Sequence, residues 1–204
     1  GSCEPVGTVA LGDAFLFYFG DRVYILAGGG YYGYDGVTFS EVEGYVPVIR
    51  TGTPPAGAGK AAEPLNLLTP KRRQRFSPDG TTMTYHLYEQ NIDEVAYVKI
   101  GGIPTYAYTV NVQEGKVIFE AAPAAGTDTV EICWRKDSIA AAGRRARVLA
   151  MRRAMVSGSG DARVFLWGGQ GAQKPDYLVG QDGGRAVGRV FHRKGRLLCG
   201  QRGI

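Results

Sequence analysis

The sequence predicts a mainly β fold, in which an antiparallel β-sandwich module is inserted between blade-like β-meander segments, with one short helix. Glycine accounts for 31 of the 204 residues, roughly twice the usual share of about 7%, which favours many tight turns. The 12 Tyr outnumber the 8 Phe, and Tyr favours pleated, half-exposed surfaces. Short apolar runs between Gly and Asp-Gly signals are typical of antiparallel strands.

The segments differ enough in composition to predict a domain organisation. We expect a β-meander over residues 1–49, a linker and basic junction over 50–75, the β-sandwich module over 76–137, a helix plus a strand that returns to the first segment over 138–180, and a poorly ordered basic tail over 181–204.

The first segment contains the short runs 15–19, 22–26 and 31–34, separated by glycines. Residues 28–33 also match the G-x-G-x-x-G pattern of dinucleotide-binding loops. That motif needs a helix start to hold the pyrophosphate, whereas a strand and an Asp-Gly turn follow here. The pattern therefore predicts a hairpin loop.

Residues 50–64 hold three Pro and three Gly and no large apolar side chain. Such a stretch buries too little surface to offset its ordering entropy, so we expect an exposed linker. The basic run that follows it, over residues 71–75, is interpreted as a solvated junction, with an acidic partner chain or nucleic-acid phosphate as the alternative.

From residue 76 to 136 the apolar residues alternate in short runs, with turn signals at the spacing of a sandwich. This pattern predicts an autonomous module. The residues expected in its core are Tyr97, Ile100, Val110, Val117, Phe119, Val130 and Ile132.

After the module, an N-cap residue followed by alanines predicts a helix from about residue 138. Its expected apolar stripe consists of Ile139, Ala142, Ala146, Leu149 and Ala150. A strand over 162–167 follows. Residues 20–26 and 160–166 share Gly-Asp and then Arg-Val-aromatic-aliphatic, which would suit a blade-like repeat.

The residue inventory points away from catalysis, so we expect no enzyme, no cofactor and no metal. The three Cys, at positions 3, 133 and 199, are too far apart for C-x-x-C metal chemistry. His86 and His192 are the two histidines, which restricts acid–base and zinc chemistry. We find no signal peptide and no apolar run long enough to span a bilayer.

Four segments carry a resemblance to a known group of proteins. Residues 34–47, 66–71, 76–81 and 161–168 are similar to segments of uncharacterised structural proteins, virion or tail-associated, of tailed bacteriophages and prophages of gut bacteria. The likeness covers about residues 15–180. Residues 98–126 also resemble β-sandwich decorations of phage virion proteins. The resemblance implies no catalytic residue, and a location in the virion or, during assembly, in the host cytoplasm.

Three functions follow as hypotheses. The first is a virion structural protein that binds other virion proteins or itself, with Tyr31, Tyr32 and Tyr34 as interface candidates. The second is a carbohydrate-binding module, in which Tyr106, Tyr108 and Trp134 would stack on sugar rings.

The third hypothesis is nucleic-acid binding. The chain carries a net charge of +5, and the predicted basic patch consists of Lys71, Arg72, Arg73 and Arg75. Because aromatic residues do not interleave with this patch as they do in a stacking platform, nucleic acid is the least favoured partner.

Overall fold

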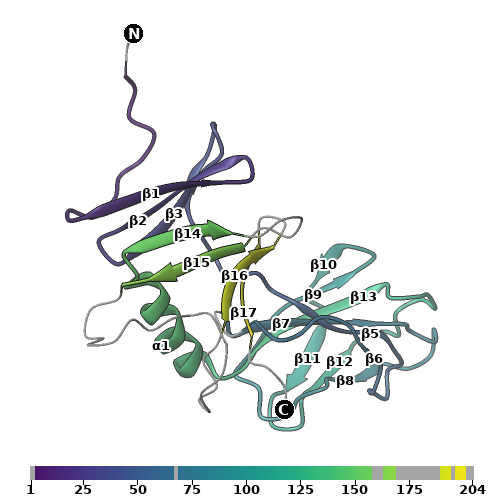
Figure 1. Cartoon of the computed structure of the whole chain (residues 1–204). Coiled ribbons are helices and arrows are strands. Elements are labelled where there is room, and N and C mark those ends of the chain that lie inside the picture. The colour runs from purple at the N-terminus through teal and green to yellow at the C-terminus, as the bar shows by residue number, and fades with distance from the viewer. Residues whose placement is uncertain (1–2, 67–68, 158–162, 169–188, 194–195, 201–204) are drawn as a thin grey trace. The chain divides into compact units, whose positions relative to one another are not determined.

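The computed structural model describes residues 3–66, 69–157, 163–168, 189–193 and 196–200. Over these residues the chain is mainly β, with mostly antiparallel strands and one short helix (Figure 1). The predicted fold class is confirmed at this level. The chain divides into two compact units, one made of Gly1–Tyr45 with Ala142–Ile204 and the other of Val46–Ala141.

The first unit begins with a four-stranded sheet whose consecutive strands pair antiparallel. Its strands are β1 (Ala14–Phe19), β2 (Arg22–Ala27), β3 (Gly30–Tyr34) and β4 (Phe39–Glu41). Gly28 and Gly29 turn the chain between β2 and β3 with φ of 55° and 81°, a left-handed conformation that glycine adopts without strain. The hairpin loop predicted at this glycine run is confirmed.

The same unit contains two further antiparallel pairs, β14 (Arg153–Ser157) with β15 (Arg163–Trp167) and β16 (Arg189–Arg193) with β17 (Arg196–Gly200). The last pair differs from the predicted poorly ordered tail over 181–204, because Val-Phe and Leu-Leu pairs provide two β-favouring runs. The rest of that tail lies outside the described residues. So do residues 160–162, and the blade-like repeat therefore stays a prediction.

The second unit contains a six-stranded sheet and a three-stranded sheet. The larger has the strand order β10-β9-β13-β7-β5-β6 and the smaller β11-β12-β8. All neighbours pair antiparallel except β5 and β7, which are parallel. The strands are β5 (Val48–Thr53), β6 (Lys60–Ala61), β7 (Lys71–Phe76), β8 (Thr84–His86), β9 (Glu94–Ile100), β10 (Ile103–Thr105), β11 (Tyr108–Asn111), β12 (Lys116–Phe119) and β13 (Val130–Arg135).

Most of strand β5 and all of β6 lie within residues 50–64, where the sequence predicted an exposed linker, and that prediction is wrong. The backbone polar groups of this stretch find partners that its composition did not reveal. Gly57 N–H donates to Pro54 O at 2.9 Å, which closes a turn, and His86 N–H donates to Pro55 O at 2.9 Å. Thr53 is fully buried.

The basic run at 71–75 is strand β7, in the interior of the six-stranded sheet between β13 and β5. The prediction of a solvated junction is therefore wrong as well. Side chains alternate along the strand, and Arg72, Gln74 and Phe76 are buried. Period-two alternation is the expected pattern of a strand, but the inward polar residues concealed it.

One hydrophobic core in this unit takes side chains from both sheets, including Val117 and Phe119 of β12 and Val130 and Ile132 of β13. These four residues were predicted as core, and Ile100 and Val110 pack against the same cluster half-buried. Tyr97 lies on the opposite side of the larger sheet, where it contacts Glu131, so its predicted place in the core is wrong.

Helix α1 (Ser138–Leu149) confirms the predicted helix but not its apolar stripe. Ala141 and Val148 are the buried positions, whereas Ile139 is 92% exposed. The buried side is thus rotated from the expected one. The sequence signal for the buried side was weak. Five of the twelve helical residues are small, four alanines and one glycine, and they carry too little apolar surface to determine which side of the helix is buried.

Candidate functional site

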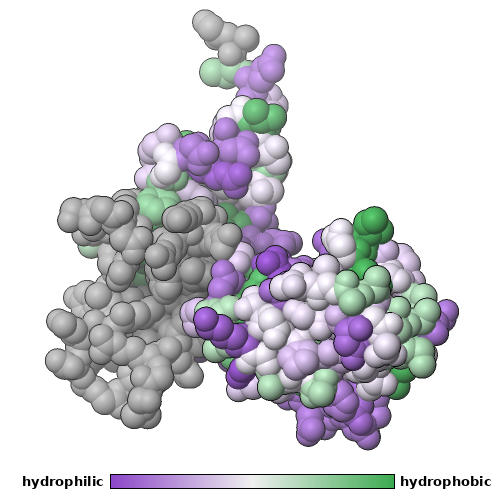
Figure 2. Space-filling model, turned by 90° about the vertical axis from the view of Figure 1, so that its right-hand side faces the viewer, coloured by the Kyte–Doolittle hydropathy of each residue, from purple (hydrophilic) through white to green (hydrophobic). Residues whose placement is uncertain are grey.

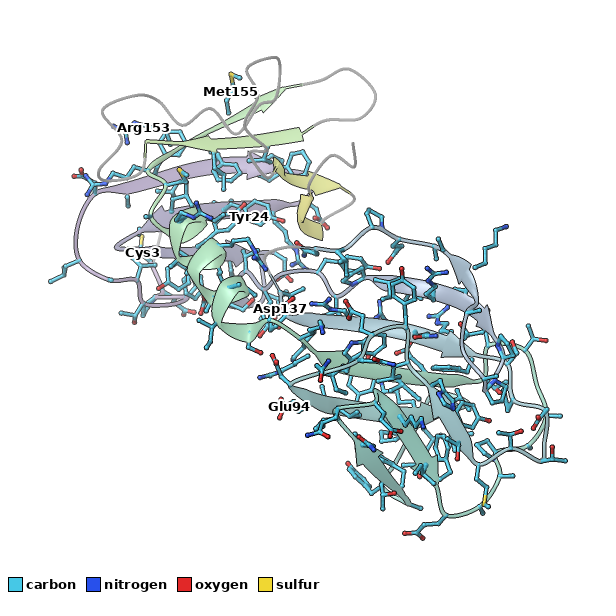
Figure 3. All side chains as sticks on the ribbon, turned by 90° about the horizontal axis from the view of Figure 1, so that it is seen from below. Cys3, Tyr24, Glu94, Asp137, Arg153 and Met155 are labelled. Carbon is cyan, nitrogen blue, oxygen red and sulfur yellow. The ribbon has the colours of Figure 1, made fainter. Side chains whose placement is uncertain are left out.

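One face of the β1–β4 sheet forms the core of the first unit. Phe17, Tyr24 and Tyr31 form a cluster of rings, with centroid distances of 5.4 Å, 6.2 Å and 5.7 Å, and Tyr24 lies among the side chains of this unit (Figure 3). Tyr31 is fully buried. Burial, with a smaller effect of Tyr24, raises the pKa of Tyr31 far above its usual value. Tyr31, an interface candidate, is therefore a core residue.

The opposite face of this sheet is also apolar but is open to solvent. Register places Leu16, Ile25 and Tyr32 in one cross-strand row and Tyr18, Val23, Tyr34 and Phe39 in the next. We call these seven residues the aromatic face. Leu16 is 59% and Tyr18 65% exposed, and the other five are half-buried.

The interface candidates Tyr32 and Tyr34 belong to the aromatic face, and both are held in place. The Tyr32 ring stacks on Phe39 at 5.4 Å between centroids, and Gly7 lies against the Phe39 ring. The Tyr34 hydroxyl donates to Gly36 O at 2.8 Å. The N-terminal stretch thus contacts Phe39, while Leu16 and Tyr18 remain open.

The turn that follows β3 is fixed by Asp35. Its carboxylate accepts hydrogen bonds from Thr38 N–H at 2.7 Å and Val37 N–H at 3.0 Å, and Arg22 lies 3.3 Å away. The two backbone hydrogen bonds hold the pKa of Asp35 below its usual value, with a smaller contribution from Arg22. This end of the aromatic face is therefore preorganised.

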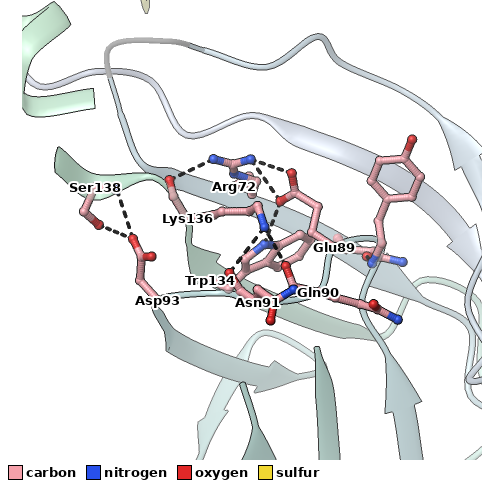
Figure 4. A network of polar contacts seen from close by, with 10 residues as sticks. Arg72, Glu89, Gln90, Asn91, Asp93, Trp134, Lys136 and Ser138 are labelled. Carbon is pink, nitrogen blue, oxygen red and sulfur yellow. Dashed lines mark hydrogen bonds and ion pairs between the residues drawn. The ribbon is translucent and has the colours of Figure 1, made fainter. Parts of the chain in front are cut away.

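The predicted basic patch is divided between the two sides of β7. Arg72 points into the unit, where its Nη1 contacts Glu89 Oε1 at 2.7 Å and its Nη2 donates to Lys136 O at 3.0 Å (Figure 4). Trp134 Nε1 donates to Glu89 Oε2 at 3.0 Å. Arg72 is thus part of a buried structural network and is not available to a phosphate.

Arg73 and Arg75 lie on the other side of the sheet and share Glu131, at 3.6 Å and 3.1 Å. Tyr97 donates a hydrogen bond to the same carboxylate at 3.0 Å. Burial alone would raise the pKa of Glu131, but the hydrogen bonds from Arg75 and Tyr97 and the charge of Arg73 outweigh it and lower that pKa. Lys71, the fourth patch residue, is half-buried.

The three sugar-stacking candidates do not share an exposed face. Trp134 is fully buried and Tyr106 is 87% exposed, while Tyr108 packs against the core. Figure 2 shows one face of the molecule, on which the hydrophobic side chains of the second unit stand in small groups among hydrophilic ones. The arrangement required for the stacking hypothesis is therefore absent from the described residues.

Within the described ranges, no group of three or more His, Cys, Asp or Glu is placed to hold a metal ion. Among the same residues no helix is both long and apolar enough to cross a membrane. Cys133 is fully buried, and burial raises the pKa of its thiol to about 11 despite the nearby Lys71 and Arg73.

Sequence reasoning missed Leu16 and Tyr18 as surface residues. Residues 15–19 are all apolar, so alternation could not show which side faces solvent. It also missed Lys99, which cross-strand register brings beside Glu131. Pairing between distant strands is not readable from a single sequence.

Comparison with protein-family models, with curated proteins and with solved structures finds no match to this chain.

Proposed function

We propose that this chain is a non-catalytic assembly protein that acts through protein–protein contacts, and that it works in the virion of a tailed bacteriophage. The observation that carries the proposal is the aromatic face. Large exposed apolar patches mark interaction sites, and Tyr is enriched in interface cores. Leu16 and Tyr18, on the edge strand β1, provide its most exposed apolar surface, and the resemblance to phage structural proteins supplies the setting.

Two further features support an assembly role. The turn at Asp35 and the Tyr32–Phe39 stack fix the aromatic face before binding, which lowers the entropy cost of association. We also infer that the two sheets of the second unit form a β-sandwich, since one core takes side chains from both. Such a module would act as a rigid body.

The test introduces charge into the aromatic face and leaves the opposite, buried face of the β1–β4 sheet unchanged. L16K/Y18K replaces its two most exposed residues, and I139K is the matched control, because Ile139 is a highly exposed apolar residue on helix α1. Light scattering after size exclusion would measure self-association over a concentration series. Retention of purified particle proteins on the immobilised chain would measure binding to partners.

We expect the wild type and I139K to associate with themselves or with particle proteins, and L16K/Y18K to lose most of that binding. Two lysines buried in the interface should weaken binding by a factor of a hundred or more, corresponding to about 3 kcal/mol. A wild-type chain that stays monomeric at all concentrations and retains no particle protein would contradict the proposal.

A further inference from the structure

A second surface lies on the side of the six-stranded sheet that faces away from the core of the second unit. Register aligns Arg75 of β7, Glu131 of β13 and Lys99 of β9 in one cross-strand row. Arg73 lies one row further along and also contacts Glu131. This row is the centre of what we call the cationic face, defined by Arg73, Arg75, Lys99 and Glu131.

The cationic face is hollowed by a cavity of about 450 Å³, which Gly101, Gly102, Asp128 and Thr129 also line. Both of its carboxylates are already engaged. Glu131 accepts from Arg75 and Tyr97, and Asp128 accepts from Gly52 N–H at 2.6 Å. The lining holds three cationic side chains against these two carboxylates, so its net charge is positive.

Lys99 is the cation with spare capacity. Its Nζ lies 4.9 Å from the centroid of the Tyr97 ring, and among the described residues no carboxylate lies within 4.0 Å of it. An ammonium group without a carboxylate partner is the complement of an incoming anionic oxygen.

We propose that this cavity binds carboxylate side chains of an acidic segment of a partner protein, with Lys99 as the main contact and Arg75 beside it. Strand β10 favours a protein segment over nucleic acid. It places the exposed Pro104 directly opposite Lys99, on the same side of the sheet. A proline ring at the rim suits a peptide better than a phosphate backbone, which needs a row of unpaired cations, whereas Arg73 and Arg75 are already paired with Glu131.

The same strand argues against binding by strand addition. Proline cannot donate to a sheet ladder and is confined to edge strands with its nitrogen toward solvent, so Pro104 blunts the free edge of β10. Recognition therefore rests on side chains across the face. This site lies in a different unit from the aromatic face, so the inference stands apart from the proposed function.

The test is a titration of the isotope-labelled full chain with hexaglutamate peptide at low salt, followed by amide NMR shifts. A single-stranded thymidine hexanucleotide provides the nucleic-acid arm. K99Q is the test variant. K60Q is its matched control, since the exposed Lys60 lies on β6 at the opposite edge of the same sheet. The spectrum of each variant reports whether it is folded.

We expect the peptide to shift the amide signals of Gly101, Gly102 and Thr129 saturably, K99Q to weaken binding about fivefold, and K60Q to bind like the wild type. The fivefold estimate corresponds to loss of about 1 kcal/mol for one partly exposed charge pair. Absence of saturable shifts, or an equal loss in K60Q, would overturn the site. Tighter binding of the oligonucleotide at the same amides would overturn the assignment of an acidic protein segment.

Discussion

Glu89 is the residue on which the buried polar network of the second unit depends most. Its carboxylate accepts from both Arg72 and Trp134, and the side chains of Arg72 and Glu89 are 8% and 17% exposed. Removing one partner of a buried pair leaves the other charge uncompensated, which costs more than the pair itself contributes.

We therefore expect Glu89→Ala to lower the free energy of unfolding by about 3–5 kcal/mol. Glu89→Gln should cost less, because the amide oxygen still accepts from Trp134. The exposed Glu94, which pairs with Arg135 at 3.2 Å, is the control, and Glu94→Ala should cost about 0–1 kcal/mol. Urea unfolding followed by tryptophan emission measures all three, and equal effects at the two positions would contradict the role of the network.

At the same scale, the sequence could predict which apolar residues are core but not which polar ones are. Phe119 and Val130 were identified because they alternate within β-favouring runs. Arg72 and Gln74 were not, because their burial depends on Glu89 and on the Tyr88 N–H, partners that lie in a loop elsewhere in the chain. Burying a polar residue costs free energy unless it has hydrogen-bond partners, and those are set by the tertiary fold.

At the scale of elements, residues 50–64 show why composition misled. A stretch of Pro, Gly and Ala lacks apolar side chains, but it can still pair through its backbone. Arg50 Nη1 donates to Gly59 O at 2.9 Å, and β5 pairs with both β6 and β7. Glycines in this stretch permit turns and close contacts that side chains would prevent.

Two glycines of this stretch give a matched test. Gly52 and Gly59 both have left-handed φ, 58° and 69°, but a Cβ at Gly52 would meet nothing within 4 Å. A Cβ at Gly59 would lie 2.9 Å from Thr53 Cβ and 3.1 Å from Thr51 O. Gly52→Ala should thus cost about 1–2 kcal/mol from backbone strain, and Gly59→Ala about 1–3 kcal/mol more from the clash.

Urea unfolding of the two variants measures this difference. A flexible linker would tolerate both substitutions with little change in stability. Equally small losses of stability at the two positions would therefore support the original prediction that residues 50–64 are an exposed linker.

At the scale of the whole molecule, the sequence located a β module within the chain but placed its start too late. The chain from Val46 to Ala141 forms one unit, whereas turn signals alone suggested 76–137. The missing part is β5 to β7. Strand β7 lies between β13 and β5 in the larger sheet, and Ile49 of β5 belongs to the shared core.

This boundary makes a prediction about fragments. A fragment of residues 46–141 should fold alone and unfold cooperatively, because it retains both sheets, the core and the Arg72–Glu89–Trp134 network. A fragment of residues 76–137 should not, because β13 loses β7 along one edge and Glu89 and Trp134 lose Arg72. The chain has two Trp, at 134 and 167, so Trp134 is the sole Trp in each fragment, and excitation at a wavelength that only Trp absorbs reports on it alone. We expect blue-shifted emission and a sigmoidal urea transition for 46–141, and red-shifted emission without a transition for 76–137. Phe119→Ala in the longer fragment should lower its stability by about 3–5 kcal/mol, as expected for a core ring. A cooperative transition of the 76–137 fragment at a similar urea concentration would show that β5 to β7 are dispensable and that the shorter module is the folding unit.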